Sequence, residues 1–255
     1  MSVVTPNDSG LLPALFAGFE KDFGYQVQVS TAEDVYGPAK AGKVDLVISH
    51  YGHSDVNTFV LAGYGGWPLA VFFNQVALVG PSSDPARVRG LTDAAEAFRR
   101  IAQTQSSFVV NDIEGMRYLG EVLWEAAGEP ARGAWYVDPN LKGPDAIKAA
   151  ADRGGYTLWG VTPFQQLQKQ SHNELQPLVL SDPLLQRIMV AIVVNPLKVQ
   201  GANQKGATTL QKYLLAPATQ AKVRAFRVSG YPQQLWWPAG RNNETTVLPL
   251  VKPTP

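Results

Sequence analysis

Two hydrophobic patterns alternate along this chain, and their alternation restricts the fold more than any other feature. Short runs rich in β-branched residues, such as 44–49 and 188–194, are typical of strands. The segments between them, such as 11–23 and 91–102, carry apolar residues three or four positions apart and predict amphipathic helices. Strands that alternate with helices form mixed, mostly parallel sheets with helices on their faces. The sequence therefore predicts an α/β fold.

The length of 255 residues suits two lobes of about 100–150 residues, each with its own core. Proline-containing breaks at Gly80-Pro81 and Asn195-Pro196 follow two long strands and mark candidate crossings between lobes. The sequence predicts one lobe from 1–80 plus 195–255, a second from 81–194, and hinges near 80–84 and 192–196. Further strands are predicted at 3–5, 26–30, 69–79, 108–110, 156–159 and 175–180.

Composition and motifs exclude several classes of protein. The net charge is +1, without a basic stripe, so we expect no nucleic-acid partner. The absence of cysteine excludes disulfides, thiolate metal sites and a cysteine nucleophile. No apolar run approaches the ~18 residues of a membrane span. Neither Gly-x-Ser-x-Gly nor Ser-x-x-Lys occurs, so we expect a binding protein without a cofactor rather than an enzyme.

Four loops follow predicted strands and open predicted helices. Ligands of open α/β sheets bind beyond the carboxyl ends of strands, where helix N-termini present N–H groups. An aromatic ring at such a loop can stack on a flat or apolar ligand, and we expect this of Trp159. The loop residues predicted to contact a small-molecule or ion ligand are Asn7, Asp8, Ser9, Ser49, His50, His53, Asn111, Asp112, Glu114, Trp159 and Thr162.

His50 and His53 allow two interpretations. A His-x-x-His pair at a strand end can bind zinc, nickel or iron if carboxylates such as Asp112 or Glu114 add oxygen ligands. The same pair can equally cap a helix or donate hydrogen bonds to a ligand that carries no metal. Similarly, Asp112 and Glu114 stand where acidic residues commonly interact with a helix dipole. We favour ligand contact for the histidines and keep the metal site as an alternative.

An ordered series of segments, taken as a whole, resembles one family. The segments include Asn-Asp-Ser-Gly-Leu-Leu at 7–12, Val-Asp-Leu-Val-Ile-Ser-His at 44–50, Val-Gly-Pro-Ser-Ser-Asp-Pro at 79–85, Asp-Pro-Leu-Leu at 182–185 and Val-Val-Asn-Pro at 193–196. This series resembles the tungstate-binding proteins of ABC importers, within the molybdate- and phosphate-type class of periplasmic receptors. The similarity follows the same order over nearly the whole chain.

The resemblance implies a two-lobed, type II Venus-flytrap fold that closes on an oxyanion. The family holds this ion with hydroxyls, backbone N–H groups and an arginine; Thr5 stands at one hydroxyl position, and Arg117 lies near the place of the arginine. The resemblance also implies a periplasmic or extracellular protein, an export signal already removed, and an importer permease as partner. We expect a monomer.

The second-lobe loop departs from the family pattern. Residues 110–117 lack the family's serine, arginine and threonine, and bring in Asp112 and Glu114. A dehydrated dianion needs several charge-assisted hydrogen bonds of about 1.5–3 kcal/mol each. The loop therefore predicts a neutral, cationic or metal-bearing ligand instead of a simple oxyanion. Two alternatives stay open: a receptor-like or sensor module without transport, and a metal-binding protein or enzyme that uses His50 and His53.

Overall fold

The chain divides into two compact units. The computed structural model describes residues 1–6, 9–52, 54–170, 174–230, 232 and 234–240. Unit 1 comprises Met1–Asn74 and Ile188–Pro255, and unit 2 comprises Gln75–Arg187. The chain passes from unit 1 to unit 2 within strand β4 (Leu69–Pro81) and returns within strand β9 (Gln186–Val193). The hinges near 80–84 and 192–196 stay predictions.

Unit 1 is built around a mixed sheet with the strand order β10-β4-β9-β3-β1-β2. Strand β1 is parallel to β2 and β3, whereas β3 is antiparallel to β9 and β10 is antiparallel to β4. The other elements of unit 1 are β1 (Ser2–Thr5), α1 (Leu11–Phe23), β2 (Gln28–Thr31), α2 (Tyr36–Lys40), β3 (Leu46–His50), α3 (Ser54–Leu61), α8 (Gln204–Leu215), α9 (Pro217–Ala225) and β10 (Trp236–Pro238).

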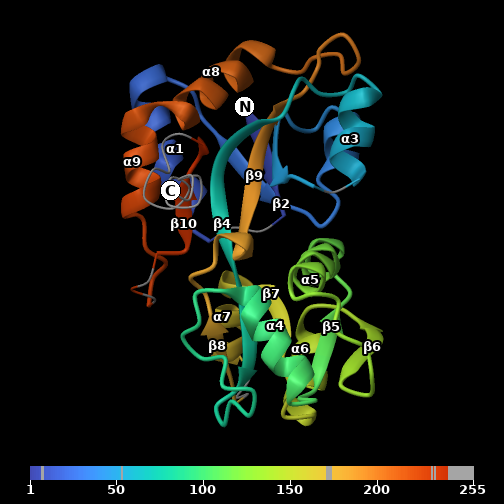
Figure 1. The fold of residues 1–255 in the computed structure, drawn as a ribbon. Helices are drawn as coiled ribbons and strands as arrows, with labels where there is room; N and C mark the ends of the chain where they lie inside the picture. Colours follow the sequence, from blue (N-terminus) through green and yellow to red (C-terminus); the bar gives the residue numbers. More distant parts are fainter. Residues whose placement is uncertain (7–8, 53, 171–173, 231, 233, 241–255) are drawn as a thin grey trace, which may run out of the picture. The chain divides into compact units, whose positions relative to one another are not determined.

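Helices cover both faces of the unit 1 sheet. Figure 1 shows α1, α8 and α9 on one side and α3 on the other. On the α1 side, the Phe19 ring stacks on Tyr25 at 5.5 Å between centroids and meets Tyr213 at 5.4 Å. On the α3 side, Phe59 packs into a buried aliphatic cluster with residues such as Ile192. Successive strand residues point to opposite faces, so one sheet supplies both cores.

Unit 2 contains a second α/β core. Residues 76–79 of β4 pair antiparallel with β7, residues 78–81 pair antiparallel with β8, and β5 is parallel to β6. The elements of unit 2 are α4 (Ala94–Gln103), β5 (Phe108–Asn111), α5 (Glu114–Ala126), β6 (Tyr136–Leu141), α6 (Pro144–Asp152), β7 (Thr157–Gly160), α7 (Val161–Gln170), β8 (Leu175–Val179) and a 3-10 turn at Pro183–Leu185.

The α/β fold with mixed sheets flanked by helices is confirmed. Parallel pairing is less dominant than the sequence suggests, because β4 and β9 run against several of their neighbours. None of the helices in the described parts of the chain is long and apolar enough to cross a membrane.

Tyr156 organises the interior of unit 2. Its ring is fully buried, and its hydroxyl donates a hydrogen bond to Asp84 Oδ1 (2.8 Å) and accepts one from the Ala86 N–H (2.9 Å). Burial raises the pKa of the Tyr156 hydroxyl above its ordinary value. A Cβ atom at Gly80 would collide with this ring, so the strand needs glycine where it crosses Tyr156.

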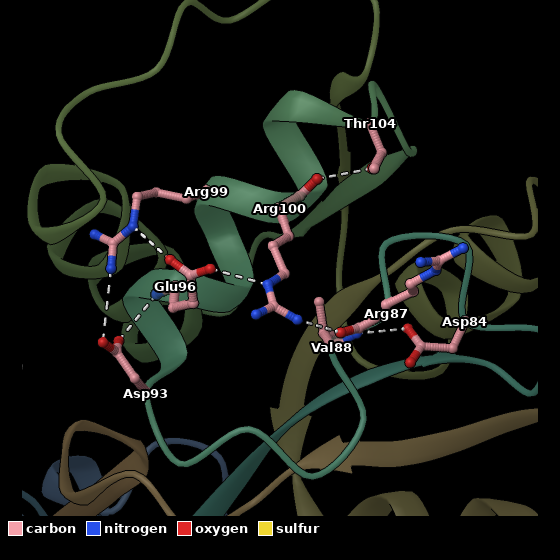
Figure 2. A network of polar contacts seen from close by, with 8 residues as sticks. All are labelled: Asp84, Arg87, Val88, Asp93, Glu96, Arg99, Arg100 and Thr104. Carbon is pink, nitrogen blue, oxygen red and sulfur yellow. Dashed lines mark hydrogen bonds and ion pairs between the residues drawn. The ribbon is translucent and has the colours of Figure 1, made fainter.

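A polar network fixes the start of α4 (Figure 2). The Asp93 carboxylate caps the helix by accepting the Glu96 N–H at 2.9 Å. The Glu96 carboxylate accepts from Nε of Arg99 (2.8 Å) and of Arg100 (2.9 Å), and these bonds lower the pKa of Glu96. Arg100 also donates to the Arg87 carbonyl at 2.9 Å, so the network ties the preceding loop to the helix.

Gln220 should contribute strongly to the stability of unit 1. Its side chain is 2% exposed; Nε2 donates to the carbonyls of Val71 (2.8 Å) and Leu214 (2.6 Å), and Oε1 accepts the Ala239 N–H (2.6 Å). Gln220→Ala leaves these buried backbone groups unpaired, and we expect a loss of about 3 kcal/mol in the free energy of unfolding. Urea denaturation measures the loss, with the exposed Gln204→Ala as control. Equal midpoints for the two variants would contradict the prediction.

Candidate functional site

Parallel strands bring several predicted residues to one edge of unit 1. Strands β1 and β3 are parallel neighbours, so their carboxyl ends lie at the same edge of the sheet. Thr5 ends β1 and is 2% exposed, and Ser49 is next to last in β3 and 6% exposed. The hydroxyl residues predicted for unit 1 therefore gather where the topology places ligand sites in such sheets.

The N-terminus of α1 follows directly from this edge. Gly10 is the N-cap residue with φ of 85°, a left-handed conformation that glycine adopts without a steric penalty. Among the described residues, no side chain caps the helix, and no acidic residue stands in its first turn. The Ser9 Oγ atom is buried and has no hydrogen-bond partner among the described residues. A helix N-terminus with a spare hydroxyl favours negative charge. Asn7 and Asp8 lie outside the described residues.

His50 is positioned by Asn74. The Asn74 amide nitrogen lies 2.9 Å from Nε2 of His50. The two nitrogens are within hydrogen-bond distance, and this contact fixes the orientation of the imidazole ring at the end of β3. His53 lies outside the described residues, so the predicted histidine pair is not described. Among the residues that the structure covers, no group of three or more His, Cys, Asp or Glu side chains could hold a metal ion.

In unit 2, Asn111 links three elements. The side chain is 2% exposed at the end of β5. Its Nδ2 donates to the Leu158 carbonyl of β7 at 3.1 Å, and its Oδ1 accepts the Gly143 N–H before α6 at 3.0 Å. The Asn111 amide thus already makes hydrogen bonds to backbone groups through both Nδ2 and Oδ1. Contact between Asn111 and a ligand stays a prediction.

Asp112 is paired with Arg117. The Arg117 guanidinium donates from Nε to Asp112 Oδ1 at 2.8 Å and makes a two-bond pair with Asp138 at 2.7 and 2.9 Å. Hydrogen bonding to Arg117 holds the pKa of Asp138 below its ordinary value, and the same bonds raise the pKa of Arg117. Arg117 therefore points at carboxylates of its own unit, and the charge of Asp112 is balanced locally.

The Arg187 guanidinium lies close to Glu114, and the sequence analysis did not predict this cation. Arg187 is 8% exposed, and its guanidinium donates to the Gly115 carbonyl at 2.5 Å in the first turn of α5. Burial lowers the pKa of Arg187, and the negative charge of Glu114 opposes this shift. A Cβ at Gly115 would collide with the guanidinium, so glycine is needed where the arginine passes. The signal in the sequence was an arginine within a strand-like apolar run.

Trp159 and Thr162 lie at the end of β7 and the start of α7. Trp159 is 8% exposed, and its ring approaches Gly143, so most of its surface is already covered. Thr162 is half-buried in the first turn of α7, which carries no acidic residue. Stacking of a ligand on Trp159 stays a prediction.

Comparisons with known proteins agree on one family. The chain is 30% identical over 237 residues to an inferred ABC transporter anion-binding protein of Haloferax volcanii, covering 91% of this chain and 68% of that protein. It is 27% identical to the tungstate-binding protein TupA of Peptoclostridium acidaminophilum, covering 93% and 84%.

Solved structures give the same result. The fold matches the tungstate-binding protein TupA of Desulfovibrio alaskensis with a TM-score of 0.78 and 26% identity, over 94% of this chain and 99% of that one. The tungstate ABC transporter structure from Geobacter sulfurreducens matches with a TM-score of 0.73 and 28% identity, over 89% and 98%.

The family profile described as a PBP superfamily domain matches residues 1–218. The resemblance predicted from the ordered sequence segments is confirmed. The chain belongs to the PBP superfamily and is a homologue of the tungstate-binding proteins of ABC transporters.

Proposed function

We propose that this protein is the extracytoplasmic substrate-binding protein of an ABC importer and that its ligand is a small inorganic oxyanion. The names of its relatives support the class: one is called anion-binding, and two bind tungstate. The observation within this chain that carries the proposal is the N-terminus of α1, whose first turn carries no acidic residue and which no described side chain caps, beside the Ser9 hydroxyl, which has no partner among the described residues.

This proposal departs from the expectation of a neutral or cationic ligand. That expectation rested on the serine, arginine and threonine that the second-lobe loop lacks, and on the added charges of Asp112 and Glu114. Arg117 pairs with Asp112, and Arg187 lies near Glu114. Two guanidiniums thus lie near the three carboxylates of Asp112, Glu114 and Asp138, and the repulsion of an anion is lower than it would be for the carboxylates alone.

A panel of ligands tests the proposal directly. Tungstate, molybdate, sulfate and phosphate are compared with divalent metals, amino acids and polyamines by thermal shift. We expect the largest rise in melting temperature from an oxyanion, because a ligand at a hundred times its Kd adds ~2.7 kcal/mol of stability. Small-angle scattering on the same samples tests the predicted lobe closure as a fall in radius of gyration. A largest shift from a metal or polyamine would overturn the anion proposal.

Ser9→Ala separates ligand binding from folding. The Ser9 hydroxyl has no partner among the described residues, so its loss should change the unfolding free energy by less than about 0.5 kcal/mol. If the hydroxyl donates to the anion, the Kd should rise about tenfold. Calorimetry measures the Kd and urea denaturation the stability, with the exposed Ser229→Ala as control. An unchanged Kd would remove Ser9 from the site.

Arg117→Gln tests the charge balance of α5. The change leaves Asp112 and Asp138 without their common cation, and we expect the Kd for the oxyanion to rise about tenfold. The matched control is Lys148→Gln, which removes one exposed cation from the same unit. A Kd that rises equally in both variants would indicate a general charge effect, and a fall in the Kd after Arg117→Gln would contradict the proposal.

A further inference from the structure

Three separate segments meet at one end of unit 1. The Asn195 Nδ2 donates to the Gly63 carbonyl at 2.7 Å, and the Asn195 N–H donates to the Tyr64 carbonyl at 2.8 Å. A Cβ at Gly42 would lie 3.4 Å from the side chain of Val199. Figure 1 shows the C-terminal end of α3, the start of β4 and the loop between β9 and α8 at this same end. Residues 36–44, 61–69 and 195–205 therefore form one continuous surface.

The most exposed large apolar side chains of the described chain lie on this surface. Leu197 is 92% exposed, Leu61 is 86% exposed and Trp67 is 76% exposed. Each stands on a segment whose backbone is held in place: Leu197 follows the Asn195 turn, and Trp67 follows Gly66, whose N–H donates to the Val193 carbonyl at 2.8 Å. Exposed apolar side chains gathered in this way mark an interaction surface.

Lysines stand on the same three segments as these apolar side chains. The ammonium groups of Lys40 and Lys198 each lie 5.9 Å from the centre of the Tyr64 ring. Lys43 and Lys205 add two exposed cations. The three segments contain no aspartate or glutamate. The neighbouring Asp45 carboxylate is occupied by the Ser2 and Asn203 N–H groups, at 2.8 Å each.

We propose that this surface docks on an anionic lipid bilayer. We call it the basic apolar surface, and it is formed by Leu61, Trp67, Leu197, Lys40, Lys43, Lys198 and Lys205. Tryptophan and leucine side chains insert among lipid headgroups, and lysines around them bind anionic lipids while their stems extend along the bilayer. Protein interfaces are depleted of lysine, so the lysine rim favours lipid over a protein partner.

The surface is separate from the candidate ligand residues of unit 1. Parallel strands β1 and β3 begin near Ser2 and Asp45, beside the basic apolar surface, and end at Thr5 and His50. Lipid docking and ligand contact therefore use opposite edges of the same sheet. Docking would hold the receptor near an importer in the membrane while leaving the edge with Thr5 available.

Vesicle flotation tests the proposal with the full chain. We expect the protein to float with phosphatidylcholine vesicles that contain about one third phosphatidylglycerol, less at high salt, and not with phosphatidylcholine alone. Trp67→Ser combined with Leu197→Ser should lower the vesicle affinity about tenfold, and Lys43→Gln combined with Lys205→Gln should do the same. Because all four side chains are exposed, the thermal midpoint and the oxyanion Kd should not change.

Matched controls remove similar groups from unit 2. Leu184→Ser deletes a leucine that is 44% exposed, and Lys148→Gln with Lys169→Gln deletes two exposed cations. These variants should float like the unmodified protein. Absence of flotation, or flotation that survives Trp67→Ser with Leu197→Ser, would overturn the proposal. The proposal would also be overturned if the protein did not bind vesicles and sedimentation showed a dimer that Trp67→Ser with Leu197→Ser dissociates. A second copy of the chain would then occupy the surface.

Discussion

At the start of α5, the guanidiniums of Arg117 and Arg187 lie near three carboxylates, and the charge of the candidate site in unit 2 depends on these contacts. A carboxylate withdrawn from water without a cation is costly, typically by several kcal/mol. Arg117 donates a direct hydrogen bond to Asp112, and Arg187 donates to the carbonyl of Gly115, the residue after Glu114. A loop that reads as acidic in the sequence therefore has two cations beside its carboxylates, which lowers its repulsion of an anion.

The sheet of unit 1 presents two edges with different chemistry because β1 and β3 run in the same direction. Their carboxyl ends carry Thr5 and Ser49 beside the α1 N-terminus, whose partial positive charge is not cancelled by an acidic first turn. Their amino ends lie near the lysines and exposed apolar side chains of the basic apolar surface. Substitutions can thus change the recognition of a small anion without changing docking through the basic apolar surface, and the reverse.

Local patterns predicted the elements that have strong periodicity. Helix α1 spans Leu11–Phe23 as expected, because its buried face recurs at helical spacing and Gly24 ends it with φ of 70°. Strand β6 (Tyr136–Leu141) was missed because Asp138, Pro139 and Asn140 interrupt the alternation; its pairing with β5 defines it as a strand. The bounds of helix α3 were not predicted, because eight residues are too few for a clear period.

The sequence alone determined the α/β class and, through the order of its segments, the family, because both depend on patterns within short stretches of chain. It also placed Thr5, Ser49 and Asn111 at or next to strand ends, and Ser9 in the loop before a helix. Tertiary structure alone decided the charge of the site: Arg187 contacts Gly115 across 72 positions of sequence. It also gathered Leu61, Trp67 and Leu197 from different segments. Electrostatic pairing and surface patches depend on distances between elements, and periodicity within one element carries no information about those distances.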